Sequence, residues 1–253
     1  MTARNRFRRI KAISCDGDMT LWDFEKVMRH SLGYALTELR ERLPGRASAD
    51  LTIDKMIEIR NEVAGELKGK IFNLEEVRFH AFVRTVRFVG REDRELAAHL
   101  NSIYLKHRFE DIELYPDVLS TLDTLADRYA LGLLSNGNSY PEHCGLGERF
   151  SFVVFSQGVG FEKPDERIFE VACRQAGCTP RELIHVGDSL ESDVQGAKRV
   201  GAVSVWLNRE RKPRESGIVP DFEICSLHEL SIIFTENTKA SNKPDAGAAL
   251  QRT

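Results

Sequence analysis

The second half of the chain alternates short apolar runs with segments of helical spacing. The apolar runs cover 130–134, 152–155, 183–186, 202–207 and 222–225. The segments of helical spacing between them cover 116–129, 165–177 and 191–200. This alternation is typical of βαβ units, whose strands are continuously apolar because helices cover both faces of a parallel sheet. We therefore predict an α/β core on a parallel sheet, to which the apolar run at 10–15 also belongs.

The stretch between the first strand and residue 115 has a different pattern. Four amphipathic segments follow one another at 24–43, 50–68, 73–89 and 91–108, with no strand pattern between them. Helices in this number can share a core of their own, whereas a loop of that length would be unusual. We predict a helical domain at 23–111, inserted into a core made of 1–22 and 112–236. The last residues, 237–253, are poor in large apolar side chains, so we expect a disordered tail.

Polar side chains follow four of the predicted strands. They are Asp16, Asp18 and Thr20 after 10–15, Ser135 and Asn136 after 130–134, Lys163 after 152–155, and Asp188 and Asp193 after 183–186. Each short motif alone is more often a solvated turn, a surface charge or a helix cap. Ligands of open parallel sheets bind beyond the carboxyl ends of the strands. The complete set therefore favours a single active site.

In this order the motifs resemble those of the haloacid-dehalogenase superfamily, phosphohydrolases with an aspartate nucleophile and, in one branch, a helical (C1-type) cap. The match covers DxDxT (Asp16, Asp18, Thr20), the second-motif serine (Ser135), the KPD lysine (Lys163) and the acidic GDSxxxxD motif (Asp188, Asp193). It extends from residue 10 to about residue 230. The resemblance implies a Rossmann-like parallel sheet core with an inserted helical cap domain. The glycine usual after the second aspartate is Met19 here.

The resemblance also implies chemical roles. Asp16 would be the nucleophile and Asp18 the general acid and base. Thr20, Ser135, Asn136 and Lys163 would bind the phosphate. Mg²⁺ would bind Asp16, Asp188 and the backbone carbonyl of Asp18, with Asp193 in support, because its octahedral shell suits carboxylates, waters and a phosphate oxygen. The expected activity is Mg²⁺-dependent hydrolysis of a small phosphomonoester through an aspartyl phosphate.

Three alternatives remain open. The dehalogenases that resemble this chain typically replace the second aspartate, so Asp18 favours a phosphatase. A phosphonatase would need a cap lysine that forms a Schiff base, and nothing marks Lys55, Lys68 or Lys70 for this role. A non-catalytic regulatory or binding module on the same fold would have no need of the complete set of motifs.

Composition narrows the cellular setting. Lys and Arg number 36 against 39 Asp and Glu, a net charge of -3, so the chain lacks the basic excess of a protein that binds nucleic acid polymers. Its apolar runs fall far short of the roughly 20 residues of a membrane-spanning helix. The 5 cysteines are an odd number and form no CxxC pair, which favours a cytoplasmic protein. The expected partner is a small phosphorylated metabolite, and the oligomeric state is left open.

Overall fold

The structure, a computed structural model, describes residues 9–214 and 216–239. Its centre is a six-stranded sheet with the order β3-β2-β1-β4-β5-β6, in which all neighbours are parallel. The strands are β1 (Ala12–Cys15), β2 (Ala130–Ser135), β3 (Phe152–Phe155), β4 (Leu183–Gly187), β5 (Val203–Leu207) and β6 (Phe222–Ile224). The predicted α/β fold with a Rossmann-like parallel sheet is confirmed.

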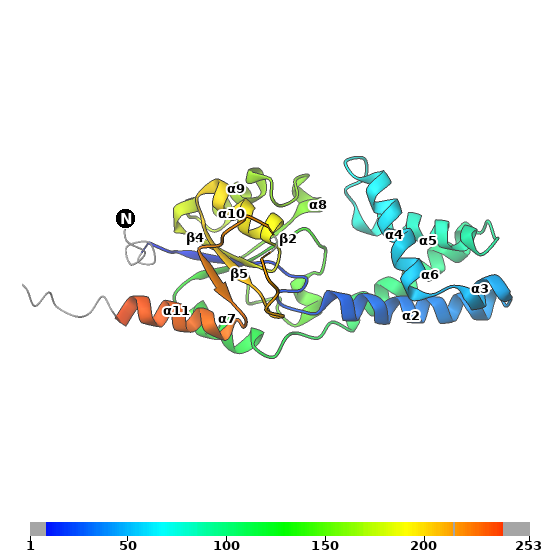
Figure 1. Ribbon diagram of the computed structural model, residues 1–253, viewed down its shortest axis with the longest axis horizontal. Coiled ribbons are helices and arrows are strands. Elements are labelled where there is room, and N and C mark those ends of the chain that lie inside the picture. The colour runs from blue at the N-terminus through cyan, green and yellow to red at the C-terminus, as the bar shows by residue number, and fades with distance from the viewer. Residues whose placement is uncertain (1–8, 215, 240–253) are drawn as a thin grey trace, which may run out of the picture.

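Helices cover both faces of the sheet (Figure 1). One face carries α9 (Glu166–Gln175) and α10 (Gly196–Val200), and the other carries α7 (Val118–Ala126) and α11 (His228–Lys239). On the first face, Phe169 of α9 packs in one core with Leu134 and Val154. On the other, Leu122 of α7 packs with Ile13. The inner strands are buried along their whole length for this reason.

The strand order reverses at β1, which has β2 on one side and β4 on the other. At its carboxyl end, Cys15 is in register with Leu133 of β2 and Val186 of β4. A reversal of this kind opens a crevice beyond the carboxyl ends of the strands. The residues that follow β1, β2 and β4 therefore meet at one edge of the sheet.

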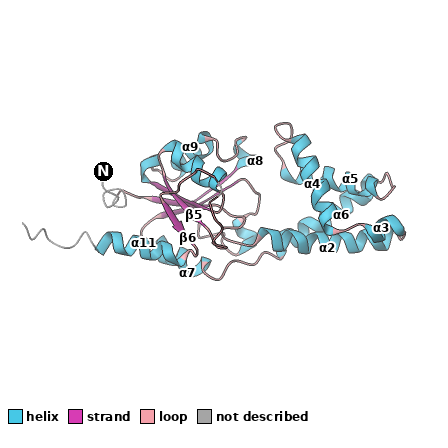
Figure 2. Cartoon of the chain, in the orientation of Figure 1, coloured by secondary structure: helices cyan, strands magenta, loops and turns pink. Residues whose placement is uncertain are grey.

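Residues 24–110 form a set of helices beside the sheet, which we call the helical insertion (Figures 1 and 2). Its members are α2 (Phe24–Arg42), α3 (Arg46–Asp50), α4 (Ile53–Leu67), α5 (Leu74–Phe88) and α6 (Arg94–Glu110). The four long helices match the four predicted segments, and α3 is an additional short helix. The predicted helix from residue 50 begins instead at Ile53, because the Thr52 side chain accepts a hydrogen bond from the backbone N–H of Lys55 and caps α4.

The helical insertion has its own hydrophobic core, with Leu39, Leu100 and Tyr104 buried at its centre. Its two connections to the sheet run side by side. Trp22 forms β-bridges with Asp18 and Leu114, and the backbone N–H of Tyr115 donates to the carbonyl of Leu21 at 2.9 Å. The chain thus enters and leaves the helical insertion next to the turn that follows β1.

The remaining elements are short turns of helix: η1 (Pro141–Cys144), α8 (Ser156–Val159), η2 (Pro180–Glu182) and η3 (Leu190–Gln195). The predicted helix at 191–200 begins as the π-helical η3 and continues as α10. Helix α11 continues to Lys239 and so includes residues 237–239, which we expected in the tail; residues 240–253 of that predicted tail lie outside the described residues. Within the described ranges no helix is both long and apolar enough to cross a membrane.

Candidate active site

Three of the predicted site residues form a buried cluster of ion pairs. Lys163 Nζ donates to Asp16 Oδ1 and to Asp193 Oδ1, each at 2.6 Å. Asp16 is 8% exposed, Lys163 3% and Asp193 1%. Asp16 directly follows β1, and its backbone N–H donates to the carbonyl of Val186 in β4. The single positive charge of Lys163 thus compensates only part of the negative charge of the two aspartates.

A third carboxylate completes an acidic group. Side-chain oxygens of Asp16, Asp188 and Asp193 all lie within 4.8 Å of one another. Burial, reinforced by the charges of Asp16 and Asp193, raises the pKa of Asp188 to about 7. Burial also raises the pKa of Asp16 to about 6, against the opposing charge of Lys163. Three carboxylates around one ammonium group leave an excess of negative charge, and a hard divalent cation such as Mg²⁺ fits a set of oxygen donors of this kind.

Residues of strand β4 fix the position of the Asp193 side chain. His185 is buried, with Nε2 at 3.0 Å from Asp193 Oδ1 and Nδ1 at 2.8 Å from the hydroxyl of Ser14. Burial alone would raise the pKa of Asp193, but Lys163 and His185 lower it below its ordinary value. A Cβ atom at Gly187 would lie 2.2 Å from Asp193 Cγ, so only glycine permits this approach.

The Asp18 carboxylate lies apart from this acidic group and has its own set of donors. Its Oδ1 accepts hydrogen bonds from Trp22 Nε1 at 2.7 Å, from the Ser139 hydroxyl at 3.3 Å and from Arg108 Nη2 at 3.5 Å. Its Oδ2 faces Gly137, because a Cβ atom there would lie 2.8 Å from Asp18 Oδ2 and 3.3 Å from Ser135 Oγ. One oxygen of Asp18 is therefore fixed by donors, and the other lies on the side of the predicted phosphate-binding hydroxyl.

Hydrogen bonds link the loop after β2 to the hydroxyl of Ser135 and to the backbone of Lys163. The Ser135 hydroxyl accepts from the backbone N–H of Gly137 at 3.0 Å. The Asn136 side chain accepts from the backbone N–H of Lys163 at 2.7 Å and donates to its carbonyl at 3.0 Å. Asn136 therefore positions Lys163 through its side chain, a role that the sequence did not indicate.

Thr20 is the predicted phosphate ligand that the structure does not tie to the others. It is completely buried, and its hydroxyl oxygen has no hydrogen-bond partner among the described residues. Its carbonyl accepts from Arg209 Nη2 at 2.9 Å. Met19, in the same turn, has φ 63°, in the left-handed region, where glycine is favoured.

Two aromatic side chains and two lysines of this region take part in packing or in surface ion pairs. Trp22 is 1% exposed and donates to Asp18, and Phe24 packs against both the sheet core and the core of the helical insertion. Lys55 pairs with Glu58 at 2.9 Å and Lys68 with Glu162 at 2.8 Å, both on the surface. Neither lysine has the burial that lowers an amine pKa for Schiff-base chemistry.

A buried aspartate at a strand end, a lysine bound to it and an acidic group lie together at one edge of the sheet. Comparison with known proteins identifies the family. Residues 10–201 match the haloacid dehalogenase-like hydrolases. The chain belongs to this family, and it is an enzyme of the hydrolase class whose similar curated relatives are phosphatases.

Two curated relatives illustrate the similarity. The chain is 30% identical to the glyceraldehyde 3-phosphate phosphatase of Methanopyrus kandleri over 241 residues, which are 91% of this chain and 99% of the relative. It is 28% identical to a 5-amino-6-(5-phospho-D-ribitylamino)uracil phosphatase of Escherichia coli over 88% of this chain and 95% of the relative. Among solved structures, a 2-haloacid dehalogenase from Pseudomonas syringae pv. Tomato DC3000 superposes with a TM-score of 0.76 at 27% identity, covering 90% of this chain and 99% of that one.

Proposed function

We propose that the protein is a Mg²⁺-dependent phosphatase that hydrolyses a small phosphomonoester through an aspartyl phosphate on Asp16. The observation that carries the proposal is that the carboxylates of Asp16 and Asp18 lie in different surroundings. Asp16 lies in the acidic group beside Lys163, whereas Asp18 lies outside it with one oxygen held by Trp22. Nucleophilic attack needs the first arrangement, and proton transfer to a leaving group needs the second.

In the first half-reaction, an Asp16 carboxylate oxygen attacks phosphorus and the bond from phosphorus to the ester oxygen breaks. Asp18, in its protonated form, gives its proton to that departing oxygen, which leaves as an alcohol. Lys163, Ser135 and the loop at 135–137 bind the phosphoryl oxygens, and Lys163 balances the charge that they carry. The Trp22 N–H holds Oδ1 of Asp18, which leaves Oδ2 on the side of Ser135 to carry the proton.

In the second half-reaction, Asp18 is a carboxylate and takes a proton from a water molecule. That water attacks the phosphorus of the aspartyl phosphate, the bond from phosphorus to the Asp16 oxygen breaks, inorganic phosphate is released and the Asp16 carboxylate is restored. Asp16, Asp188 and the backbone carbonyl of Asp18, with Asp193 in support, would hold Mg²⁺, which when bound supplies positive charge next to the phosphoryl oxygens.

The test is phosphate release from p-nitrophenyl phosphate and a panel of phosphomonoesters, with Mg²⁺ and with a chelator. We expect turnover only with Mg²⁺, and loss of several orders of magnitude in Asp16→Asn, which keeps the shape of the side chain but removes its charge. Exposed Asp127→Asn at the end of α7 is the matched control and should retain full activity. Absence of phosphate release from every ester would refute the proposal and leave a non-catalytic module on this fold.

A second candidate is a 2-haloacid dehalogenase, because the Pseudomonas syringae protein that superposes with a TM-score of 0.76 is an enzyme of that kind. Displacement of a halide needs no proton, so the donors that fix Asp18 would have no purpose in that reaction. Release of chloride from a chlorinated carboxylic acid by the purified protein, without phosphatase activity, would favour this candidate.

We further propose that 23–111 acts as a cap that closes over the crevice and excludes water. The partner would be a small phosphorylated metabolite, as the curated relatives suggest. The setting we propose is the cytoplasm, which agrees with 5 free cysteines.

Burial raises the pKa of Cys15, next to the nucleophile, to about 12, so its thiol acts as a small apolar side chain.

A further inference from the structure

Two buried arginines of the helical insertion reach the loop that follows β2. Arg78 of α5 donates through Nη2 to Asn138 Oδ1 at 2.9 Å. Arg108 of α6 donates through Nη2 to the hydroxyl of Ser139, and the same nitrogen lies 3.5 Å from Asp18 Oδ1. Arg78 is 7% exposed and Arg108 0%. The Arg108 guanidinium thus lies beside Asp18, which we propose protonates the leaving group, and the Arg78 guanidinium contacts Asn138 in the loop after β2.

Several donors of this group lack acceptors. Within the described residues no hydrogen-bond partner exists for Arg78 Nη1, for Arg108 Nε and Nη1, or for Asn138 Nδ2. Asn138 is completely buried. Buried polar groups are normally hydrogen-bonded, and charged ones left unpaired are costly. Four unpaired donors on three neighbouring side chains therefore indicate an acceptor with several oxygen atoms.

A third arginine makes the region strongly positive. Arg60 of α4 has its Cζ 5.9 Å from the centre of the Phe24 ring, and Arg108 has its Cζ 4.5 Å from the same ring. Burial, and also the charge of Arg78, lower the pKa of both Arg60 and Arg108 from the usual value, whereas Asp18 opposes this effect. Arg60 and Arg108 therefore lie near both Arg78 and Asp18, and a further negative charge would relieve the repulsion among the three guanidinium groups.

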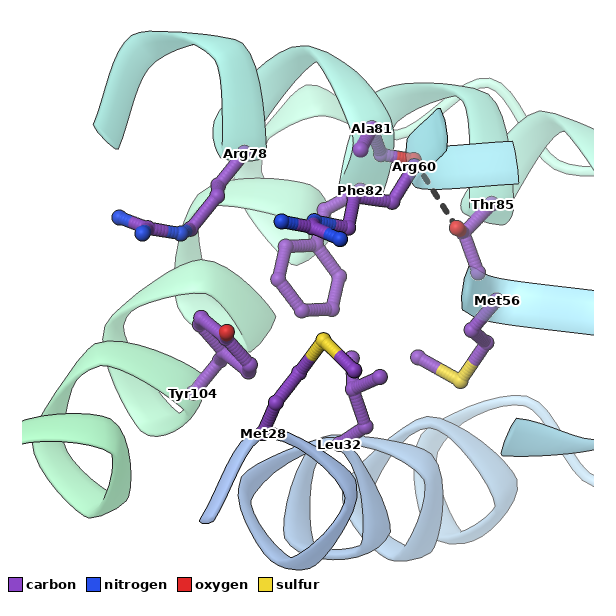
Figure 3. A pocket seen from close by; sticks show the side chains of 9 residues that line it. All are labelled: Met28, Leu32, Met56, Arg60, Arg78, Ala81, Phe82, Thr85 and Tyr104. Atoms are coloured by element: carbon purple, nitrogen blue, oxygen red, sulfur yellow. Dashed lines mark hydrogen bonds between the residues drawn. The ribbon is translucent and has the colours of Figure 1, made fainter. Parts of the chain in front are cut away.

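Arg60 and Arg78 also lie at a small cavity between the helices of the helical insertion (Figure 3). Arg60 and Arg78 line a cavity of about 20 Å³ together with Met28, Phe82 and Tyr104. A space of this size holds about one water molecule and is too small for a carboxylate or a phosphate. An anion bound by Arg78 and Arg108 must therefore lie on the side of Asn138 and Asp18.

We propose that Arg78, Arg108 and Asn138, with Arg60 behind them, bind a second anionic group on the alcohol part of the substrate. The inference rests on the proposed phosphatase function and narrows its substrate to phosphomonoesters that carry a carboxylate or a second phosphate. The planar fork of a guanidinium group matches either group through paired hydrogen bonds. Because Arg108 also contacts Asp18, the second anion would lie within a few bonds of the ester oxygen.

The experiment compares esters that differ only in this group. Phosphoglycolate is paired with ethyl phosphate, and phosphoserine with phosphoethanolamine; ethylene glycol bisphosphate separates a second phosphate from a carboxylate. In at least one pair we expect kcat/KM for the ester with the additional anion to exceed that of its partner by roughly 10- to 100-fold, the range for hydrogen bonds to charged groups. Preference for the bisphosphate over phosphoglycolate would identify the second group as phosphate.

Arg78→Met should bring this ratio close to one, and Arg78→Lys should retain part of it. The control is Arg84→Met on the same helix, where Arg84 is partly exposed and pairs with Glu66; it should leave the ratio unchanged. In Asp16→Asn, which cannot turn over, calorimetric titration with Mg²⁺ present should show the same preference in Kd. If Arg78→Met does not fold, the wild-type ratio and Arg78→Lys decide.

The inference is overturned if the esters without a second anion are hydrolysed as well as their partners, or if Arg78→Met lowers both members of a pair equally. Either result leaves the phosphatase proposal intact, because phosphate is still released. No release from any ester, p-nitrophenyl phosphate included, would instead refute the proposed function itself.

Discussion

Removal of the Asp188 charge should stabilise the metal-free protein. Asp188 follows β4 and lies with Asp16 and Asp193 in the acidic group. Burial and these two charges raise its pKa from 3.8 to about 7. Without a cation, the ionised form of Asp188 is therefore less favourable in the folded protein than in the unfolded chain. Asp188→Asn keeps the size of the side chain and removes this penalty.

The sign and size follow from linkage. A carboxyl group with a raised pKa carries almost no penalty below pH 3.8; the penalty grows between pH 3.8 and about 7 and is constant above that. At about 1.4 kcal/mol per pKa unit, complete ionisation corresponds to on the order of 4 kcal/mol. Solvent reaches part of Asp188 and screens its neighbours, so we expect a gain of about 2 kcal/mol at roughly pH 9 and almost none at about pH 4.

Urea denaturation of both proteins in chelator, at the two pH values, measures this difference. The control is Asp127→Asn, an exposed aspartate at the end of α7, which should change the free energy of unfolding equally at both pH values. Added Mg²⁺ should stabilise the wild type at alkaline pH and stabilise Asp188→Asn much less. If metal-free Asp188→Asn proves no more stable than the wild type at alkaline pH, the repulsion inferred for the acidic group is wrong.

Three further predictions concern the same edge of the sheet. Asp18→Asn should slow the first step by roughly 10²- to 10⁴-fold on alkyl phosphates but only mildly on p-nitrophenyl phosphate. With the aryl substrate, rapid quench should show a burst of p-nitrophenol of up to one per enzyme. Equal losses on both substrates without a burst would assign the acid–base role to another residue. Calcium should replace Mg²⁺ poorly, because its larger shell can engage both oxygens of a carboxylate and immobilise Asp16; full turnover in Ca²⁺ would contradict this. Met19→Gly should raise the free energy of unfolding by up to about 1 kcal/mol, because Met19 occupies the left-handed region; thermal denaturation tests it, and a loss of stability would show that the Met19 side chain has contacts that outweigh the strain.

Local patterns were sufficient to predict the sheet and the order of its motifs, because buried parallel strands and helices of ten or more residues leave distinct signals in the sequence. They failed where tertiary structure overrides a local preference. Thr179 and Glu182 form a capping box, a pattern that normally opens a longer helix, yet η2 is a single turn because Leu183 enters the buried strand β4. The helix expected from residue 191 starts as the π-helical η3, which carries the buried Asp193.

The site was predictable only where its residues belong to short motifs. Asp16, Lys163, Asp188 and Asp193 are such residues, and the structure brings them together. Arg108 and Ser139 meet Asp18 from sequence separations of 90 and 121 residues. No periodicity records pairs of this kind, since they depend on how the helical insertion packs on the core. For the same reason, no local pattern in the sequence marks Arg78 or Asn138 as part of the site.

The central claim is that Asp16 carries the phosphoryl group, and mass spectrometry of the trapped intermediate tests it most directly. Asp18→Asn, quenched in acid during turnover of p-nitrophenyl phosphate with Mg²⁺, should contain one additional phosphoryl group. Peptide mapping should place it on Asp16, and hydroxylamine should remove it, as expected of an acyl phosphate. Asp16→Asn treated in the same way should carry none. A phosphoryl group on another residue, or turnover by Asp16→Asn, would contradict the account.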